Sequence, residues 1–319
     1  RVELREKMDE NELASFLLES PYLTQAAILN TIKDAYLVYQ EIISKPEASI
    51  FDIQLLHGLM IPIHKKIEIS KMERKLKQIA SGKENVPFIV VSTQVIEAGV
   101  DVSFHHVIRA LPIIPSIVQA AGRVNRHAER EKGLLTIVPF FRSGEKDTRK
   151  SIYDRDLRRI TDNLLSTKIL WTEWEIHELV NQYYEVMFRE NTYETSKLFI
   201  RDAYEGNWEK LGNFQPFGQD YFRIPLFVPW EISEEDRLYV PEYFTTLLKE
   251  FQVSQAEEIY SLYQDKEWLQ DLSFEERKRF MMLFHHFVLN VPLDLGLKLA
   301  SKEEYLSERI PVLKDSNVY

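Results

Sequence analysis

The run VPFIVVST, residues 86–93, constrains the fold of this chain more than any other segment. Its apolar residues are continuous, mostly β-branched, and not interrupted by a charged residue. A strand of this kind is buried on both faces, which is the usual situation in a parallel sheet covered by helices. Polar residues follow directly, so the strand is expected to end near Thr93.

Shorter apolar runs on either side of this strand alternate with amphipathic segments. Further strands are expected at residues 26–30, 51–57, 106–111 and 133–140, and helices at 31–44, 63–80 and 115–125. Strands that alternate with helices predict an α/β fold with a parallel sheet and right-handed crossovers. Residues 1–19 have a helical pattern and are expected to lead into the sheet.

The composition changes near residue 142, which predicts a domain boundary there. Residues 1–142 hold 18 basic and 17 acidic side chains, a net charge of +1, whereas residues 143–319 hold 22 and 33, a net charge of −11. We predict an α/β domain over residues 1–142, a linker helix over 143–170 and an accessory domain over 171–319. Helical periodicity and a Pro- and aromatic-rich stretch make the accessory domain mostly α-helical, with some short strands.

Several classes of protein are excluded or disfavoured by composition. The chain has no cysteine, so disulfides, thiolate zinc sites and cysteine nucleophiles are ruled out. No apolar run approaches the ~18 residues of a membrane span, and the N-terminal segment is not a signal peptide. We therefore expect a cytoplasmic chain with no membrane partner. The adjacent histidine pairs, at 105–106 and 285–286, point in different directions, so no metal site is predicted.

Polar side chains follow three of the expected strands at the points where they end. Asn30 and Thr31 follow one strand, His57 a second, and Thr93 and Gln94 a third. Ligands of open parallel sheets bind outside these carboxyl ends, and all five side chains can contact phosphate. A single Thr after a strand is usually a helix cap, but the joint occurrence of these residues favours a functional edge.

Two arginines lie near the end of the helix expected over 115–125, within QAAGRVNRH. Gln119, Arg123 and Arg126 stand at positions i, i+4 and i+7, which predicts that they share one helix face. No carboxylate lies between them in the sequence, so the two guanidiniums are expected to be available for phosphate recognition. Gly99 and Asp101, in the turn after residues 86–93, add a flexible backbone position and a carboxylate.

These segments carry a resemblance to a known family. STQVIEAGVD and QAAGRVNRH resemble motifs V and VI of superfamily 2 helicases and, more narrowly, of the CRISPR-associated helicase-nuclease of type I interference systems. AILNTIKDA and LLHG resemble the motif IV region and the strand that follows it, and IYDRDLRRITDNLL resembles the helix that leaves this lobe. The resemblance covers residues ~20–142 and implies a RecA-like second helicase lobe.

The resemblance also implies an ATP site between two lobes, with Mg²⁺ bound mainly by the first. By position in the motifs, Arg126 is the expected arginine finger, Arg123 a second γ-phosphate contact, and Gln119 a residue that positions the nucleotide or the attacking water. Gly99 and Asp101 are expected to contact the ribose or a metal-bound water. An arginine finger stabilises the charge that spreads over the transferred phosphoryl group.

The strand-end residues would face single-stranded DNA through contacts that do not depend on base sequence. These residues are Asn30, Thr31, His57, Thr93 and Gln94. The implied activity is 3′→5′ translocation on DNA during the degradation of foreign DNA. The implied partners are a first helicase lobe, a nuclease domain and the RNA-guided surveillance complex.

The motifs of a first lobe and of a nuclease are missing from this sequence. The Gly-Lys pair at 82–83 is followed by Glu84, so it is not a phosphate loop, and neither a DExH box nor a His-Asp pair is present. We expect the back half of a larger enzyme, either a fragment or a separate subunit, that is inactive alone. Two alternatives remain open: a non-catalytic adaptor or regulatory subunit built on one RecA-like lobe, and a fragment of another superfamily 2 helicase.

Overall fold

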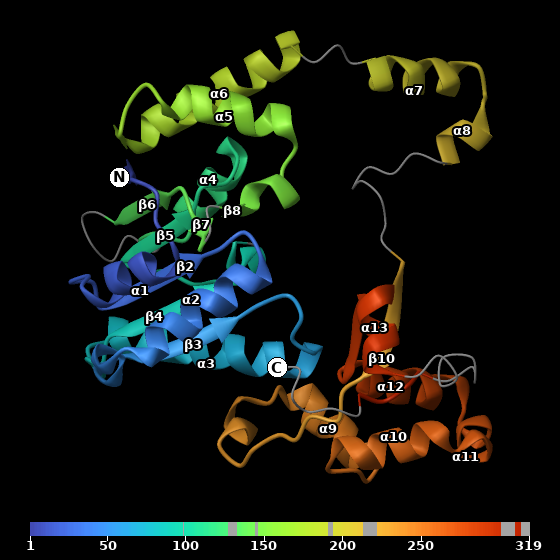
Figure 1. Ribbon diagram of the computed structural model, residues 1–319. Coiled ribbons are helices and arrows are strands. Elements are labelled where there is room, and N and C mark those ends of the chain that lie inside the picture. Colours follow the sequence, from blue (N-terminus) through green and yellow to red (C-terminus); the bar gives the residue numbers. More distant parts are fainter. Residues whose placement is uncertain are drawn as a thin grey trace. The chain divides into compact units, whose positions relative to one another are not determined.

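Two compact units make up the computed structural model (Figure 1). The described residues are 1–97, 99–126, 133–143, 146–190, 194–212, 222–300 and 310–313. The first unit comprises Arg1–Gly58 and Lys71–Thr192, and the second comprises Leu59–Ser70 and Tyr193–Tyr319. Helix α3 (Pro62–Ala80) contributes its first half to the second unit and its second half to the first.

A seven-stranded sheet forms the centre of the first unit, in the order β3–β4–β2–β5–β6–β1–β9. Its strands are β1 (Val2–Leu4), β2 (Thr24–Ile28), β3 (Asp52–Leu56), β4 (Phe88–Ser92), β5 (His106–Ala110), β6 (Leu134–Val138) and β9 (Leu170–Trp171). Neighbouring strands are parallel throughout except for β9, which runs antiparallel to β1. The predicted parallel α/β fold is confirmed. A separate antiparallel pair joins β7 (Phe141–Arg142) to β8 (Lys146–Asp147).

Strands β2, β4 and β5 lie at the middle of this sheet, and every residue in them is buried. Phe88–Ser92, the central part of the apolar run VPFIVVST, therefore has the expected two-sided burial, whereas Val86 is exposed. The register pairs Ile28 with Ser92 and Leu56 with Ser92. Because the strands are parallel, β2, β3 and β4 end at the same edge of the sheet, and the polar residues that follow them meet there.

Helices cover the sheet of the first unit. They are α1 (Glu10–Leu18), α2 (Ile32–Ser44), α4 (Ile114–Ala121), α5 (Arg155–Leu165), α6 (Glu173–Glu190) and the second half of α3. Leu17 of α1 and Val38 of α2 share one core cluster with Ala27, Ile89 and Ile108 of the central strands. Since the alternate strand residues are also buried, both faces of the sheet are covered.

Two features of the first unit differ from the sequence prediction. Residues 1–19 contain the short strand β1 before the helix α1, because Val2 pairs with Leu135 of β6. The compact unit also continues past residue 142: Trp171 of β9 pairs with Val2 at the edge of the sheet, and α6 contacts α4. Pairing and burial hold these segments on the lobe, although their composition resembles that of the residues that follow.

The second unit is mostly helical, with one two-stranded antiparallel sheet of β10 (Arg223–Phe227) and β11 (Val288–Pro292). Its helices, besides the first half of α3, are α7 (Glu194–Tyr204), α8 (Trp208–Gly212), α9 (Glu242–Glu250), α10 (Ala256–Gln264), α11 (Lys266–Asp271), α12 (Phe274–His285) and α13 (Leu293–Leu299). Phe227, Phe244, Phe280 and Phe284 are fully buried in its core. The predicted combination of helices with short strands is confirmed.

Candidate functional site

The ends of β2, β3 and β4 are tied together by hydrogen bonds. The N–H of Leu29 donates to the carbonyl of Ser92 at 2.8 Å, and the buried hydroxyl of Ser92 donates to the carbonyl of Leu56 at 2.7 Å. The N–H of Thr93 donates to the same Leu56 carbonyl at 3.3 Å. These bonds fix the backbone immediately before each of the polar residues expected to face DNA.

Asn30 forms hydrogen bonds inside the protein. Its side chain is buried, with the residue 3% exposed. Nδ2 donates to the carbonyl of Leu111 at 3.2 Å, and Oδ1 accepts from Nη1 of Arg109 at 2.7 Å. The carbonyl of Asn30 accepts from Nε2 of Gln94 at 3.2 Å. In this arrangement Asn30 braces the strand ends, and its contact with DNA stays a prediction.

The remaining strand-end residues lie at the same edge. Thr31 caps α2, with Oγ1 accepting from the N–H of Asp34 at 3.1 Å, and it is half-buried. His57 and Gln94 are also half-buried, whereas Thr93 is buried. The structure therefore brings these residues together and leaves part of the edge exposed, with Thr31 already engaged as a cap.

The predicted helix stripe of Gln119, Arg123 and Arg126 is wrong. Helix α4 ends at Ala121, and Asn125 adopts a left-handed conformation with φ +48°. Glycine and asparagine commonly occur where a helix ends, as Gly122 and Asn125 do here. Gln119 is exposed in the last turn of α4, whereas both arginines stand on the segment Gly122–Arg126, which we call the arginine loop.

Backbone and side-chain bonds anchor the arginine loop to the segment before β5. The N–H of Phe104 donates to the carbonyl of Arg123 at 2.9 Å, and the N–H of Asn125 donates to the carbonyl of Phe104 at 3.0 Å. The N–H of Arg126 donates to Oγ of Ser103 at 2.9 Å. Three hydrogen bonds thus hold the loop, so the backbone positions from which both arginine side chains extend are fixed.

The two guanidiniums have different surroundings. Nη2 of the buried Arg123 donates to the carbonyl of Glu97 at 2.7 Å, and burial together with the like charge of Arg126 lowers the pKa of Arg123. Nη1 of Arg126 lies 3.0 Å from Oδ1 of Asp101. The expectation that neither arginine has a carboxylate partner is therefore wrong, because Asp101, from another segment of the chain, pairs with Arg126. Gly99, at φ +78°, provides the left-handed turn that precedes Asp101.

Two charged residues beneath this site, Arg109 and Glu97, were not predicted from the sequence. Nε of Arg109 in β5 lies 2.7 Å from Oε1 of Glu97, and both side chains are buried. Burial raises the pKa of Glu97, and the charge of Arg109 opposes that rise. A signal was available, because an Arg inside a predicted strand of a helix-covered sheet requires a partner if it is buried.

The described residues do not fit a Mg²⁺ site. Throughout the described ranges, no three His, Asp or Glu side chains are grouped in a way that could hold a metal ion. Asp101, the carboxylate expected near the nucleotide, is paired with Arg126. Within the same ranges, no helix is both long enough and apolar enough to cross a membrane.

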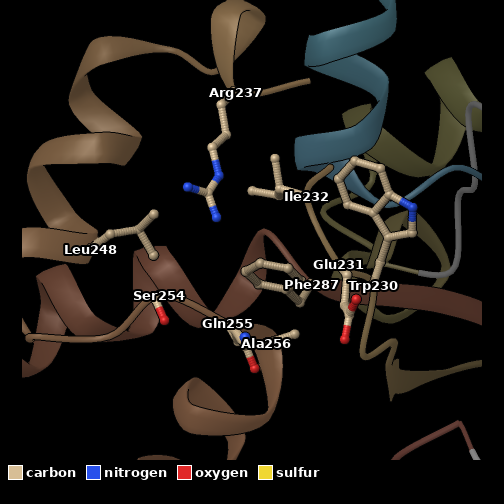
Figure 2. A pocket seen from close by; sticks show the side chains of 9 residues that line it. All are labelled: Trp230, Glu231, Ile232, Arg237, Leu248, Ser254, Gln255, Ala256 and Phe287. Atoms are coloured by element: carbon tan, nitrogen blue, oxygen red, sulfur yellow. The ribbon is translucent and has the colours of Figure 1, made fainter. Parts of the chain in front are cut away.

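A cavity of about 120 Å³ lies in the second unit (Figure 2), whereas all of the predicted site residues belong to the first. Its lining residues are Trp230, Glu231, Ile232, Arg237, Leu248, Ser254, Gln255, Ala256 and Phe287. The guanidinium of Arg237 points into it, but Arg237 is also near Glu234 and its side chain is exposed. Glu231 also lines the cavity, so the lining includes one basic and one acidic side chain.

Comparisons with known proteins match the part of the chain that carries this site. Residues 23–129 match the family described as "CRISPR-associated nuclease/helicase Cas3, C-terminal". A Cas3 nuclease/helicase of Haloferax volcanii is 34% identical over 190 residues, which cover 52% of this chain and 20% of the relative. The chain spans between 15% and 20% of the curated relatives it matches.

Solved structures are similar in fold. The crystal structure of T. fusca Cas3 matches with a TM-score of 0.61 and 15% identity, covering 95% of this chain and 37% of that one. A chain of a structure titled "CRISPR RNA-guided surveillance complex, pre-nicking" matches with a TM-score of 0.57 and 16% identity, covering 98% of this chain and 41% of that one. At these identities the likeness establishes the fold.

Proposed function

We propose that this chain, which carries the C-terminal helicase region of the Cas3 nuclease/helicase family, is the second lobe of an ATP-driven translocase on single-stranded DNA. Its role would be to supply arginines to ATP bound by a first lobe, and phosphate contacts to DNA that is being degraded. The observation that carries the proposal is the anchored arginine loop, which presents the half-exposed Arg126 beside Asp101.

Arg126 has the properties needed of an arginine finger. Its side chain is 43% exposed, and its carboxylate partner is 69% exposed, so the pair competes with water and salt. A γ-phosphate carries more charge than a carboxylate and accepts paired N–H bonds from a guanidinium. We infer that Nη1 of Arg126 keeps its contact with Asp101 while the other N–H donors of the guanidinium contact the γ-phosphate, where the positive charge stabilises the transition state.

Arg123 and Gln119 would assist from either side. The Arg123 guanidinium has one donor on the Glu97 carbonyl and keeps others for a phosphate oxygen. Gln119 is exposed at the end of α4 and could orient the nucleotide or the attacking water. Mg²⁺ would come with the first lobe, because the described residues of this chain do not fit a metal site.

Single-stranded DNA would run along the edge formed by the strand ends. Thr31, His57, Thr93 and Gln94 offer hydroxyl, imidazole, amide and backbone N–H groups there, which are suited to sequence-independent phosphate contacts. Asn30 would act indirectly, by holding Gln94. We infer that this edge and the arginine loop move together when nucleotide binds, which would shift the DNA along the lobe.

The experiment is an ATPase measurement on this chain mixed with a first-lobe polypeptide, with and without single-stranded DNA. Arg126→Ala is expected to reduce the stimulated rate by about 10³-fold. Arg5→Ala is the matched control, because Arg5 is also paired with a carboxylate on the surface and its side chain is 47% exposed. Equal rates for the wild type and Arg126→Ala would overturn the arginine-finger assignment.

The alternative of a non-catalytic adaptor predicts a different outcome. An adaptor would give no stimulated ATPase in the mixture, whereas it could still bind a partner protein. The chain alone is expected to hydrolyse almost no ATP. The dependence of single-stranded DNA affinity on salt reports the number of phosphates contacted, so a flat dependence would reject the proposed DNA edge.

A further inference from the structure

A fully buried guanidinium lies between the strand ends and the arginine loop. The side chain of Arg109 is 0% exposed, and that of its partner Glu97 is 3% exposed. Removing two charges from water is costly, and well-packed apolar residues are often at least as stable in such a place. The pair therefore calls for a reason other than stability alone.

The Nη donors of Arg109 reach two further segments, the end of β2 and the segment before α5, besides its own strand β5. Nη1 donates to the carbonyl of Ile28 at 3.2 Å, to Oδ1 of Asn30 at 2.7 Å and to the carbonyl of Ala110 at 3.0 Å. Nη2 donates to the hydroxyl of Tyr153 at 3.0 Å, just before α5. One planar side chain thus joins the end of β2, β5 and the segment that leaves the lobe.

Glu97 extends these contacts to the arginine loop. Its carboxylate holds Arg109, while its backbone carbonyl accepts from Arg123 at 2.7 Å. On the other side, Asn30 accepts from Arg109 with its side chain and from Gln94 with its carbonyl. A continuous series of contacts therefore links Arg123 to Gln94 through the buried pair.

We propose that Arg109 is a positioning residue that couples the arginine loop to the strand-end residues. The inference rests on the proposed function, in which the loop serves the nucleotide and the strand ends serve DNA. A shift of Arg123 toward a phosphate withdraws its bond from Glu97, and Glu97 transmits the change to Arg109. Arg109 then alters the hold on Asn30 and Gln94, so each ligand affects the site of the other.

Arg109→Lys is the first test, with Arg149→Lys as its matched control. A lysine keeps the charge but cannot reach Glu97, Asn30 and Tyr153 together, because it lacks the planar fork. Arg149 is also buried in the first unit, where it pairs with Asp147 and Asp162. All three residues lie outside the arginine loop in the sequence. The control therefore reports the effect of weakening a buried arginine that has no part in the proposed coupling.

The readout is the ATPase of the full chain mixed with a first-lobe polypeptide. Arg109→Lys is expected to lose at least tenfold of the stimulation by single-stranded DNA, taken as the ratio of the rates with and without DNA. Arg149→Lys is expected to retain the stimulation. Full stimulation in Arg109→Lys, or an equal loss in both variants, would overturn the proposal. If Arg109→Lys does not fold, Glu97→Gln tests the same link with a side chain of the same shape.

A second readout separates this inference from the proposed function. Hydrogen exchange on the chain alone measures the opening of residues 93–97 and of the arginine loop. Arg109→Lys is expected to speed exchange in both segments by at least tenfold, and Arg149→Lys in neither. Unchanged exchange would overturn the coupling. If Arg109→Lys speeds exchange in both segments but the wild-type mixture shows no DNA-stimulated ATPase, the proposed function is rejected and the coupling is retained.

Discussion

Nη1 of Arg126 lies 3.0 Å from Oδ1 of Asp101, and this ion pair joins the arginine loop to the turn that follows β4. Both side chains are exposed to solvent, so the pair contributes at most ~1 kcal/mol to stability. The backbone of Arg126 is held separately by Ser103. The guanidinium is therefore oriented but can be released without disturbing the loop that carries it.

Asp101→Asn tests this orienting role. The free energy of unfolding is expected to change by less than ~1 kcal/mol, because the pair is exposed. The stimulated ATPase of the mixture with a first-lobe polypeptide is expected to fall about tenfold, because Arg126 loses its orienting charge. Urea unfolding and ATPase rates measure the two effects. A rate equal to that of the wild type would mean that Asp101 does not orient Arg126.

Gly133→Ala tests whether the arginine loop depends on a close approach of the backbone. A methyl group there would lie 2.3 Å from Cγ1 of Val124 and 2.9 Å from Cβ of Asn125, so the loop must move. We expect a loss of ~1–3 kcal/mol in the free energy of unfolding, together with a lower stimulated ATPase. Urea unfolding and the ATPase of the mixture measure the two losses.

Gly212→Ala is the matched control for Gly133→Ala. Among the described residues, no atom lies within 4 Å of the position that its methyl group would occupy, and its φ is ordinary for an L residue. Stability and stimulated rate are both expected to stay close to the wild type. If Gly133→Ala behaves like this control, the close approach does not govern the arginine loop.

The sequence was sufficient for the central sheet but not for the contacts of its loops. Residues 86–93 predicted a doubly buried strand because two-sided burial leaves a continuous apolar run. The helix cap at Thr31 could also be anticipated, since a hydroxyl before an amphipathic segment is a common helix start. Both features are local, so neighbouring residues determine them.

The site depended on contacts that sequence spacing does not encode. Gln119, Arg123 and Arg126 have the spacing of one helix face, but the helix ends at Ala121. Asp101 and Arg126 form an ion pair although they are 25 residues apart in the sequence, so no pattern of helical spacing could predict their contact. The strand β1 was missed because three residues contain too little alternation to be recognised.

Thr31→Ala separates the capping role of this residue from its expected contact with DNA. Oγ1 accepts from the N–H of Asp34 at 3.1 Å, so its loss is expected to cost ~1 kcal/mol of stability. Thr31→Ser keeps the hydroxyl and is the matched control, expected to remain close to the wild type. If Thr31→Ala also weakens single-stranded DNA binding and lowers its salt dependence by about one phosphate, the hydroxyl serves DNA as well.

His106 predicts a dependence of stability on pH. Its ring is buried beside Thr136, with Nε2 2.8 Å from Oγ1, and burial followed by the charge of Arg5 lowers the pKa of His106 to about 4. In the unfolded chain the ring takes up a proton near pH 6.5. Between these values the unfolded state binds more protons, so the free energy of unfolding falls as the pH drops from about 6.5 to 4.

The comparison of wild type with His106→Gln isolates this contribution, because other groups titrate in both proteins. The limiting slope from one such histidine is ~1.4 kcal/mol per pH unit. We expect the wild type to lose stability faster than His106→Gln between pH 6.5 and 4, and the difference to become constant below about pH 4, in urea unfolding followed at half-unit steps. His286→Gln is the companion variant, since burial, followed by the charges of Lys66 and His285, also lowers the pKa of His286 in the second unit to about 4. Parallel curves for the wild type and His106→Gln would show that the ring takes up its proton over the same pH range in the folded and unfolded states.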